Sequence, residues 1–268
     1  MPYLHETNIT FAGFRWLGYL MAFLGGAINA GGFFAVLRYT SHMSGELARL
    51  ADTLYVGDWE IAITACLMVV SFILGATHSS WTILWAKRQR FRSSYGISMW
   101  LEAIYMLIFG LMGAWLGKWG STFFLSPTIM LMCFIMGMHN TVMTVLSSGV
   151  IRSTHMTGFV TDIGIELSKV LYYRRDTNPR LPDVQVNIPK IKLFSGVITS
   201  FVVGGIVGAW GFHVLGYHFV MPVAAILFVL GFGSIGYDVR LRFRIWLYRR
   251  HRRQRAARRE KEKTDEPR

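Results

Sequence analysis

Six long apolar runs alternate with polar connections along the chain. They cover residues 15–39, 60–86, 98–117, 127–150, 193–213 and 219–238. A bilayer core of about 30 Å takes about 20 apolar helical residues to cross. Backbone polar groups in hydrocarbon must find hydrogen-bond partners within their own segment, which favours helices. The pattern therefore predicts an all-α integral membrane protein with six transmembrane helices.

Two polar motifs beyond the first and fourth runs repeat each other. Residues 41–45 read Ser-His-Met-Ser-Gly, and residues 154–158 read Thr-His-Met-Thr-Gly. Each motif follows a run that contains an asparagine, and these asparagines, Asn29 and Asn140, lie 111 residues apart. A duplicated polar motif between runs of membrane length is typical of internally repeated membrane proteins.

This duplication also predicts how the two halves are oriented. Three spans is an odd number, so two copies of a three-helix unit cross the membrane in opposite directions. We therefore expect two inverted three-helix repeats, with helices that are broken or capped at the motifs. Their expected bounds are residues 1–120 and 121–239, and a basic tail follows at residues 240–268.

The distribution of charge predicts the orientation in the membrane. The chain is 53% hydrophobic with a formal net charge of +13, and 13 of its 28 Lys and Arg follow residue 239. Four more lie at residues 87–92, whereas the connection between the third and fourth runs has only Lys118. By the positive-inside rule we expect both termini in the cytoplasm. Arginines mixed with aromatic and aliphatic residues at 239–248 predict contact with anionic lipid headgroups, and nucleic acid is a less favoured partner.

Polar side chains inside the apolar runs are candidates for function because they are costly at membrane depth. Asn29 is flanked by two glycine pairs, at residues 25–26 and 31–32. Glycines weaken a helix, so this pattern predicts a broken helix that lines a cavity. Asn140 follows His139 in the fourth run. A hydrogen bond between helices, worth about 0.6 kcal/mol, accounts for either asparagine equally well, and both interpretations stay open.

The residues after each motif are suited to begin a helix, with Ser44 or Thr157 as its N-cap. The unpaired N–H groups at such a start can bind an anion. The histidines are candidate proton carriers because imidazole titrates near neutral pH. A helix start in an ordinary loop, without any ligand, is the somewhat favoured alternative. The motif residues expected to contact a solute are His42, Ser44, Gly45, His155, Thr157 and Gly158.

Three acidic residues are candidates for coupling solute movement to an ion. Glu46 and Asp162 follow the two motifs, and Glu102 lies in the third run. For Glu102, an ion pair with the basic loop, for example with Arg92, is the favoured structural alternative. No metalloprotease, nucleophile-elbow, phosphate-loop or dinucleotide motif occurs, so we expect no enzymatic activity, no cofactor and no metal.

The glycines and asparagines of two runs, taken with the two motifs, resemble the YoaK family of bacterial multi-pass membrane proteins. The segments that carry the resemblance are residues 25–30, 42–45, 136–140 and 154–158. The resemblance covers nearly the whole chain up to the basic tail and implies about six spans in the bacterial inner (cytoplasmic) membrane, without an assigned activity. The family pattern usually has Asp at the position of Asn29, Thr-Gly-Asn at residues 44–46, and Gln at the position of His139.

Together these patterns favour a transporter or permease for a small solute, with anions among the expected solutes. The alternative is a membrane sensor or scaffold that acts through its cytoplasmic loop and basic tail. The expected partners are the lipid bilayer, anionic headgroups and an unknown small solute, and a homo-oligomer stays open.

Overall fold

The computed structural model describes residues 12–36, 39–91, 94–119, 125–173 and 186–232, and these residues form helices and turns without a β-strand. The helices are α1 (Ala12–Val36), α2 (Met43–Val56), α3 (Trp59–Arg88), α4 (Gly96–Trp119), α5 (Leu125–Leu146), α6 (Met156–Tyr173) and α7 (Ile188–Leu215). A 3₁₀ turn, η2 (Gly216–Phe219), follows α7, and residues 220–232 are helical again. The all-helical class predicted from the sequence is confirmed.

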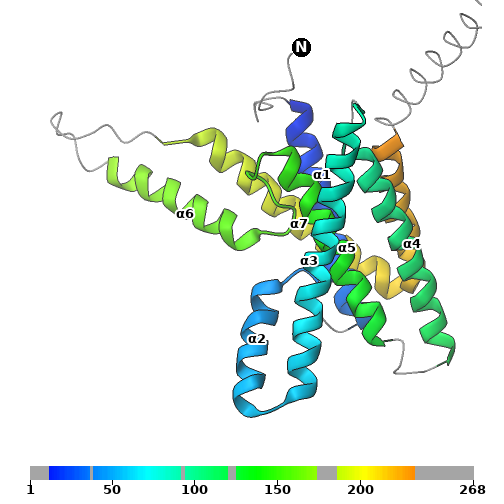
Figure 1. Cartoon of the computed structure of the whole chain (residues 1–268). Helices are drawn as coiled ribbons and strands as arrows, with labels where there is room; N and C mark the ends of the chain where they lie inside the picture. The colour runs from blue at the N-terminus through cyan, green and yellow to red at the C-terminus, as the bar shows by residue number, and fades with distance from the viewer. Residues whose placement is uncertain (1–11, 37–38, 92–93, 120–124, 174–185, 233–268) are drawn as a thin grey trace, which may run out of the picture.

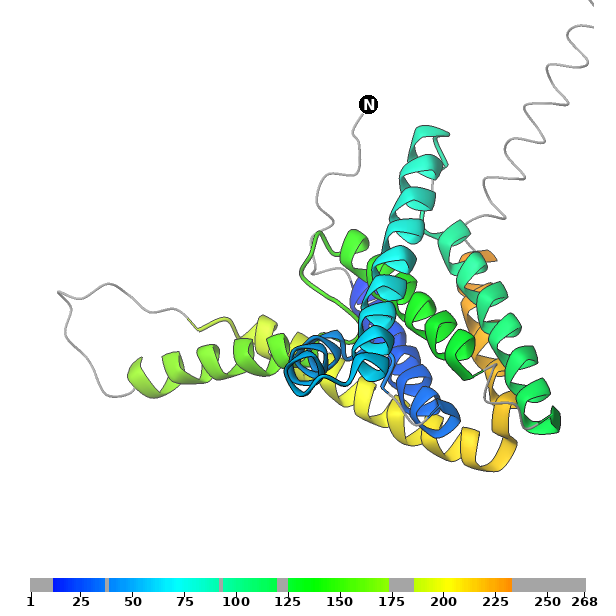
Figure 2. The same cartoon turned by 60° about the horizontal axis from the view of Figure 1, so that its bottom comes forward.

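Four stretches among the described residues are long and apolar enough to cross a membrane. They are Trp59–Arg88, Gly96–Ala114, Pro127–Leu146 and Ile188–Phe232. The last stretch contains the fifth apolar run and the described part of the sixth. The chain turns back on itself between these two runs, at η2 (Figure 2). The run that forms α1 is not among these four stretches of the described residues.

Two pairs of parallel helices form the centre of the molecule, α1 against α7 and α3 against α5. Along the first pair, Tyr19 lies beside Gly196, and Phe212 lies beside Gly31. In both pairs the backbones touch at glycines. A methyl group on Gly26 would collide with the carbonyl of Phe201, and one on Gly137 would collide with the carbonyl of Phe72. In lipid, helices gain little from burying apolar surface against each other, so such close backbone contact is what holds them together.

The two crossings are built alike. Gly204 of α7 meets the backbone of Phe23 in α1, and Gly75 of α3 meets the backbone of Phe134 in α5. Phe23 and Phe134 are 111 residues apart, the same interval that separates Gly26 from Gly137. The glycine contacts of one helix pair therefore recur at matching positions in the other.

Helices α1 and α5 cross between these pairs and run in opposite directions. Gly18 lies beside Met143, whereas Gly32 lies beside Met132. The buried side chains around this crossing belong to one hydrophobic cluster that also takes in α4, α7 and η2. Methionine is common in this cluster, where its flexible side chain fills irregular space between helices.

Helices α2 and α6 project away from this centre. As Figure 1 shows, α2 forms a hairpin with α3 at the bottom of the view, and α6 forms one with α7 at the left. Neither helix is among the stretches that could span a membrane. Each begins within one of the two polar motifs, at the third residue, so the motifs mark the points where the chain leaves the central helices.

The glycine contacts predict which helix positions tolerate no side chain. Gly26→Ala and Gly137→Ala each force a methyl group against a backbone carbonyl of the neighbouring helix. We expect each variant to lose about 1–3 kcal/mol of stability by overpacking. The measurement is the melting temperature of the purified protein in detergent, followed by size-exclusion fluorescence.

Gly164→Ala is the matched control, because nothing lies within 4 Å of a methyl group placed on this exposed position of α6. Alanine also favours a helix more than glycine does. A Gly26→Ala protein that melts together with Gly164→Ala and wild type would contradict the close backbone contact.

Candidate functional site

A buried histidine and a buried glutamate meet where α1, α4 and α5 come together. Oε1 of Glu102 lies 2.6 Å from Nδ1 of His139, and Nε2 of His139 lies 2.8 Å from the carbonyl oxygen of Met21. Both side chains are fully buried. Glu102 is six residues into α4, about 9 Å along the helix axis from its first residue. The pair thus lies inside the apolar region rather than at its edge.

The partners of His139 fix where its protons are. A carbonyl oxygen can only accept a hydrogen bond, so Nε2 must carry a hydrogen that it donates to Met21. At 2.6 Å a proton must also lie between Nδ1 and the carboxylate of Glu102, since two acceptors would otherwise face each other. The pair therefore holds one shared proton and is neutral overall, which lowers the cost of burying it.

Glu102 keeps a second oxygen, Oε2, which is buried and has no hydrogen-bond partner among the described residues. A buried carboxylate oxygen of this kind calls for a donor such as a water or a ligand. The sequence analysis favoured a partner in the basic loop for Glu102. That expectation is wrong for the described residues, where the partner is His139, and Arg92 itself lies outside them.

Asn29 and Asn140 each tie a polar motif back to the helix before it. The Ser41 hydroxyl donates to Oδ1 of Asn29 over 2.7 Å. Both the amide and the hydroxyl of Thr154 donate to Oδ1 of Asn140, over 3.1 and 3.0 Å. Helix α1 is continuous through Asn29, so the broken helix expected there is not found. Its glycines instead serve the close approach of α7 at Gly26 and neighbouring positions.

The histidine of each motif folds over the glycine three residues later. Helix α2 begins at Met43, which makes His42 its N-cap residue, and α6 begins at Met156, directly after His155. A methyl group on Gly45 would collide with the ring of His42, and one on Gly158 would collide with the ring of His155.

The expected N-caps at Ser44 and Thr157 are therefore wrong, because both residues already lie within the first helical turn. His42 makes no side-chain cap hydrogen bond, and its backbone carbonyl accepts from the N–H groups of Gly45 and Glu46. The shared His-x-x-Gly spacing follows from the packing of the ring on the glycine.

A cavity of about 410 Å³ lies beside the first motif. Its lining comes from the end of α1, the connection and α2, and consists of Phe33, Tyr39, His42, Gly45, Glu46, Ala48, Arg49 and Asp52. No residue of the second motif lines it. Thr154 of the second motif and His139 of the buried pair both adjoin Gly25, since the Thr154 methyl lies 3.3 Å and Nε2 of His139 3.2 Å from the position of a methyl group there.

Two of the three coupling candidates lie away from the buried pair. Glu46 is mostly buried and lies 3.9 Å from Arg49 on α2. Asp162 accepts a hydrogen bond from Lys190 over 3.1 Å, which links α6 to α7. The sequence alone gave no sign that Glu102, rather than these two, would meet His139, because the two residues are 37 positions apart on different helices.

Glu166 provides a second link between α6 and α7. Its carboxylate accepts from the Lys169 ammonium over 2.8 Å and from the backbone amide of Asn187 over 2.9 Å. These hydrogen bonds, that of Lys169 first, hold the pKa of Glu166 below its ordinary value. Helix α6 is outside the described stretches that are long and apolar enough to span a membrane.

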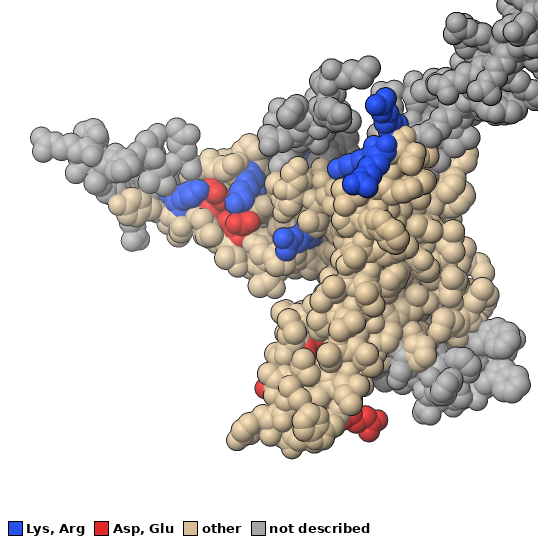
Figure 3. All heavy atoms as spheres, viewed as in Figure 1, with Lys and Arg blue, Asp and Glu red and all other residues tan. Residues whose placement is uncertain are grey.

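Charged residues gather at opposite ends of the molecule. On the face in Figure 3, Lys and Arg colour the top of the central helices, both signs of charge colour the α6–α7 hairpin at the left, and only Asp and Glu colour the lower hairpin. The upper patch includes Lys87 and Arg88 in the last turn of α3, and the lower tip includes Asp58 and Glu60 at the start of α3. The two ends of α3 therefore carry opposite charge.

Residues 17–233 match the family described as "Protein of unknown function (DUF1275)". The chain belongs to the DUF1275 family. The resemblance to YoaK proteins is thereby confirmed, and this DUF1275 member is a multi-pass membrane protein of unknown function. Among curated proteins and among solved structures, no significant match to the chain was found. The matched region includes both motifs and the buried pair of this DUF1275 protein.

Acid should weaken the attachment of α6 to α7 in this DUF1275 protein. A carboxylate with a lowered pKa stabilises the folded arrangement above its ordinary pKa, and this contribution is lost as the pH falls through the ordinary value and then the lowered one. We expect backbone hydrogen exchange in α6, corrected for its intrinsic pH dependence, to speed up between pH 7 and about pH 3. Mass spectrometry of peptides covering residues 156–173 measures it.

Glu166→Gln should exchange faster at pH 7 and lose most of this pH dependence, because its side chain no longer titrates. The control is Glu60→Gln, which changes an exposed carboxylate on a different hairpin. An unchanged pH profile for Glu166→Gln would show that another group controls α6.

Proposed function

We propose that this DUF1275 protein is a proton-coupled transporter or permease for a small solute, and that the shared proton of Glu102 and His139 is the coupled ion. The observation that carries the proposal is the buried pair itself. Ionisable groups at membrane depth cost several kcal/mol and are retained where an ion or a substrate passes. One oxygen of Glu102 has no partner among the described residues, so it is ready for a donor that arrives with the solute.

The proposed architecture is six spans arranged as two inverted repeats, residues 1–120 and 121–239. The matched glycine contacts of α1 with α7 and of α5 with α3 support it. So does the antiparallel crossing of α1 and α5, since an inverted repeat requires equivalent helices to run in opposite directions. The excess of Lys and Arg at the end of α3 supports placing that end, and both termini, in the cytoplasm of a bacterial cell.

The proposed path runs past both motifs. The first motif follows the end of α1 and the second follows the end of α5, and these ends point in opposite directions. His42, Ser44 and Gly45 would face the solute at the outer side, next to the 410 Å³ cavity. His155, Thr157 and Gly158 would face it at the inner side. Between them, Asn140 and Thr154 adjoin Gly25 and the buried pair.

In this mechanism a donor group of the solute hydrogen-bonds to Oε2 of Glu102, and the shared proton shifts from Glu102 toward Nδ1 of His139. When one motif opens, the Glu102–His139 pair is exposed to the compartment on that side of the membrane. When that motif closes and the other motif opens, the pair is exposed to the opposite compartment. The hydrogen bonds Ser41–Asn29 and Thr154–Asn140 would hold the motifs closed. Asp162 and Glu46, near the motifs, would follow these movements rather than bind the proton.

Loss of the titratable group at position 102 should abolish proton movement. Glu102→Gln keeps the shape of the side chain and can donate from its amide to Nδ1 of His139, but it cannot release a proton. We expect wild-type proteoliposomes that contain the dye pyranine to show solute-dependent proton flux for at least one member of a panel of small carboxylates, inorganic anions, amino acids and sugars. Glu102→Gln should fall to the level of protein-free liposomes.

The control for this experiment is Glu60→Gln, an exposed change at the start of α3 that should leave the flux unchanged. Wild-type flux in Glu102→Gln would remove the pair from the mechanism. A function that survives Glu102→Gln and requires the chain from residue 249 onward would instead favour the scaffold, which acts through a tail outside the described residues.

The hydrogen bond from Ser41 to Asn29 should affect the rate of transport, although neither side chain binds the transported proton. Asn29→Leu removes the acceptor for the partly buried hydroxyl of Ser41, and loss of such a hydrogen bond costs about 0.5–1.5 kcal/mol. We expect faster leak or slower solute uptake in the same proteoliposomes. Asn29→Asp keeps an acceptor oxygen and should behave more like wild type. Equal uptake by Asn29→Leu and wild type would exclude Asn29 from the transport path.

A further inference from the structure

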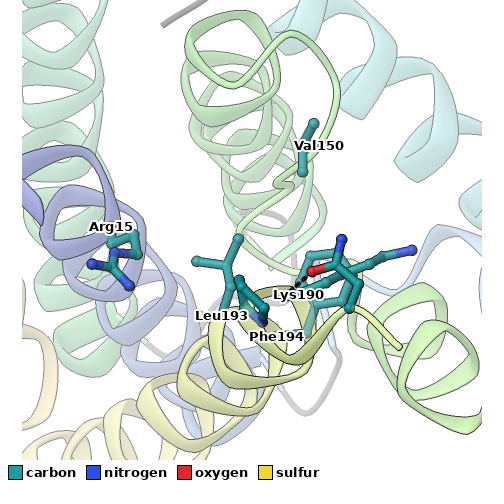
Figure 4. Close-up of a pocket in the computed structure, with 7 residues that line it drawn as sticks. Arg15, Val150, Lys190, Leu193 and Phe194 are labelled. Carbon is teal, nitrogen blue, oxygen red and sulfur yellow. Dashed lines mark hydrogen bonds between the residues drawn. The ribbon is translucent and has the colours of Figure 1, made fainter. Parts of the chain in front are cut away.

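A second cavity, of about 250 Å³, lies between α1, the start of α7 and the connection after α5 (Figure 4). Most of its lining is hydrocarbon. Two basic side chains from different helices complete it, Arg15 from α1 and Lys190 from α7. The remaining lining residues are Val150, Asn187, Pro189, Leu193 and Phe194.

The two cations retain hydrogen-bonding capacity. Arg15 is exposed, and no carboxylate of the described residues lies within 4 Å of it. Its guanidinium carries five N–H donors. Lys190 donates to Asp162 over 3.1 Å and lies 5.5 Å from the centre of the Phe194 ring. An ammonium has three N–H donors, so the contact with Asp162 leaves capacity for a second acceptor.

The position of the cavity along the helices matches the level of lipid headgroups. Helices α1 and α7 are parallel and start at the same end of the molecule, because Tyr19 lies beside Gly196. The basic last turn of α3 lies at this end too, since α3 runs parallel to α5 and α5 runs antiparallel to α1. Trp16, next to Arg15, is 65% exposed. Exposed tryptophan beside basic residues is typical of the boundary between hydrocarbon and water.

We propose that this cavity binds an anionic phospholipid. Its phosphate would accept hydrogen bonds from Arg15, with Lys190 adding positive charge from the other side of the cavity, and the first part of an acyl chain would lie against Val150 and Pro189. The apolar lining argues for a lipid over a soluble anion, because a free phosphate gains nothing from hydrocarbon walls. Basic pockets between membrane helices are suited to such headgroups. The site is separate from the basic tail and does not depend on the proposed transport.

The test is native mass spectrometry of the full-length protein in detergent, titrated with 1-palmitoyl-2-oleoyl phosphatidylglycerol. Arg15→Gln removes one cation of the pocket, and Arg88→Gln is the matched control, since it makes the same change at the same end of the molecule outside the cavity lining. We expect Arg15→Gln to weaken the tightest lipid adduct about fivefold or more. Arg88→Gln should leave that adduct unchanged.

A second variant tests the apolar part and keeps both charges. Val150→Trp places a large ring at the mouth of the cavity, on a connection where Val150 is 38% exposed. It should weaken phosphatidylglycerol binding while the melting temperature stays at the wild-type value. Loss of binding in Val150→Trp and in Arg15→Gln, but not in Arg88→Gln, supports the pocket.

Three results would overturn the proposal. Equal affinity for phosphatidylcholine and phosphatidylglycerol would show that the charge of the headgroup plays no part. Displacement of the lipid by millimolar inorganic phosphate would show that the site binds a free anion. Identical weakening in Arg15→Gln and Arg88→Gln would show only general attraction of lipid to a basic face.

Discussion

Contact between helix backbones at glycine residues is the constraint on which the rest of this structure depends. Water drives apolar surfaces together in soluble proteins, but a lipid-exposed helix loses nothing by staying among acyl chains. Here Gly26 and Gly204 bring α1 onto α7, and Gly137 and Gly75 bring α5 onto α3. These contacts fix the spacing of four helices, and the remaining helices pack around them.

Close helix packing also supplies the hydrogen bonds that lower the cost of burying an ionisable pair. Because α1 lies so close to α5, the carbonyl of Met21 reaches Nε2 of His139. That hydrogen bond orients the imidazole, so its other nitrogen faces Glu102 across 2.6 Å. Without the glycine at position 25, a side chain on α1 would press on the ring of His139. The chemistry of the site thus rests on Gly25, the neighbour of the glycine that brings α1 onto α7.

Much of the fold follows from the sequence because it depends on local pattern. Length and hydropathy predicted helices of membrane length, whereas the glycines around Asn29 predicted a broken helix and instead allow close helix contact. The partner of Glu102 did not follow, because the neighbours of a buried acid depend on how α4 and α5 rotate against each other. The N-caps at Ser44 and Thr157 also failed. Their polar side chains suggested a cap, but the packing of His42 on Gly45 sets the start of the helix two residues earlier.

The two halves of the central helices agree in packing and differ in chemistry. The interval of 111 residues that relates Gly26 to Gly137 places Ile28 at the position equivalent to His139. Ile28 is as deeply buried as His139 but has no polar atom in its side chain. A duplicated polar site would put two ionisable pairs into the same apolar core, at twice the cost of burial. With isoleucine at one of the two equivalent positions and histidine at the other, only one of these two described positions has a buried ionisable pair. The crossing of α1 and α5 therefore holds a proton at one place.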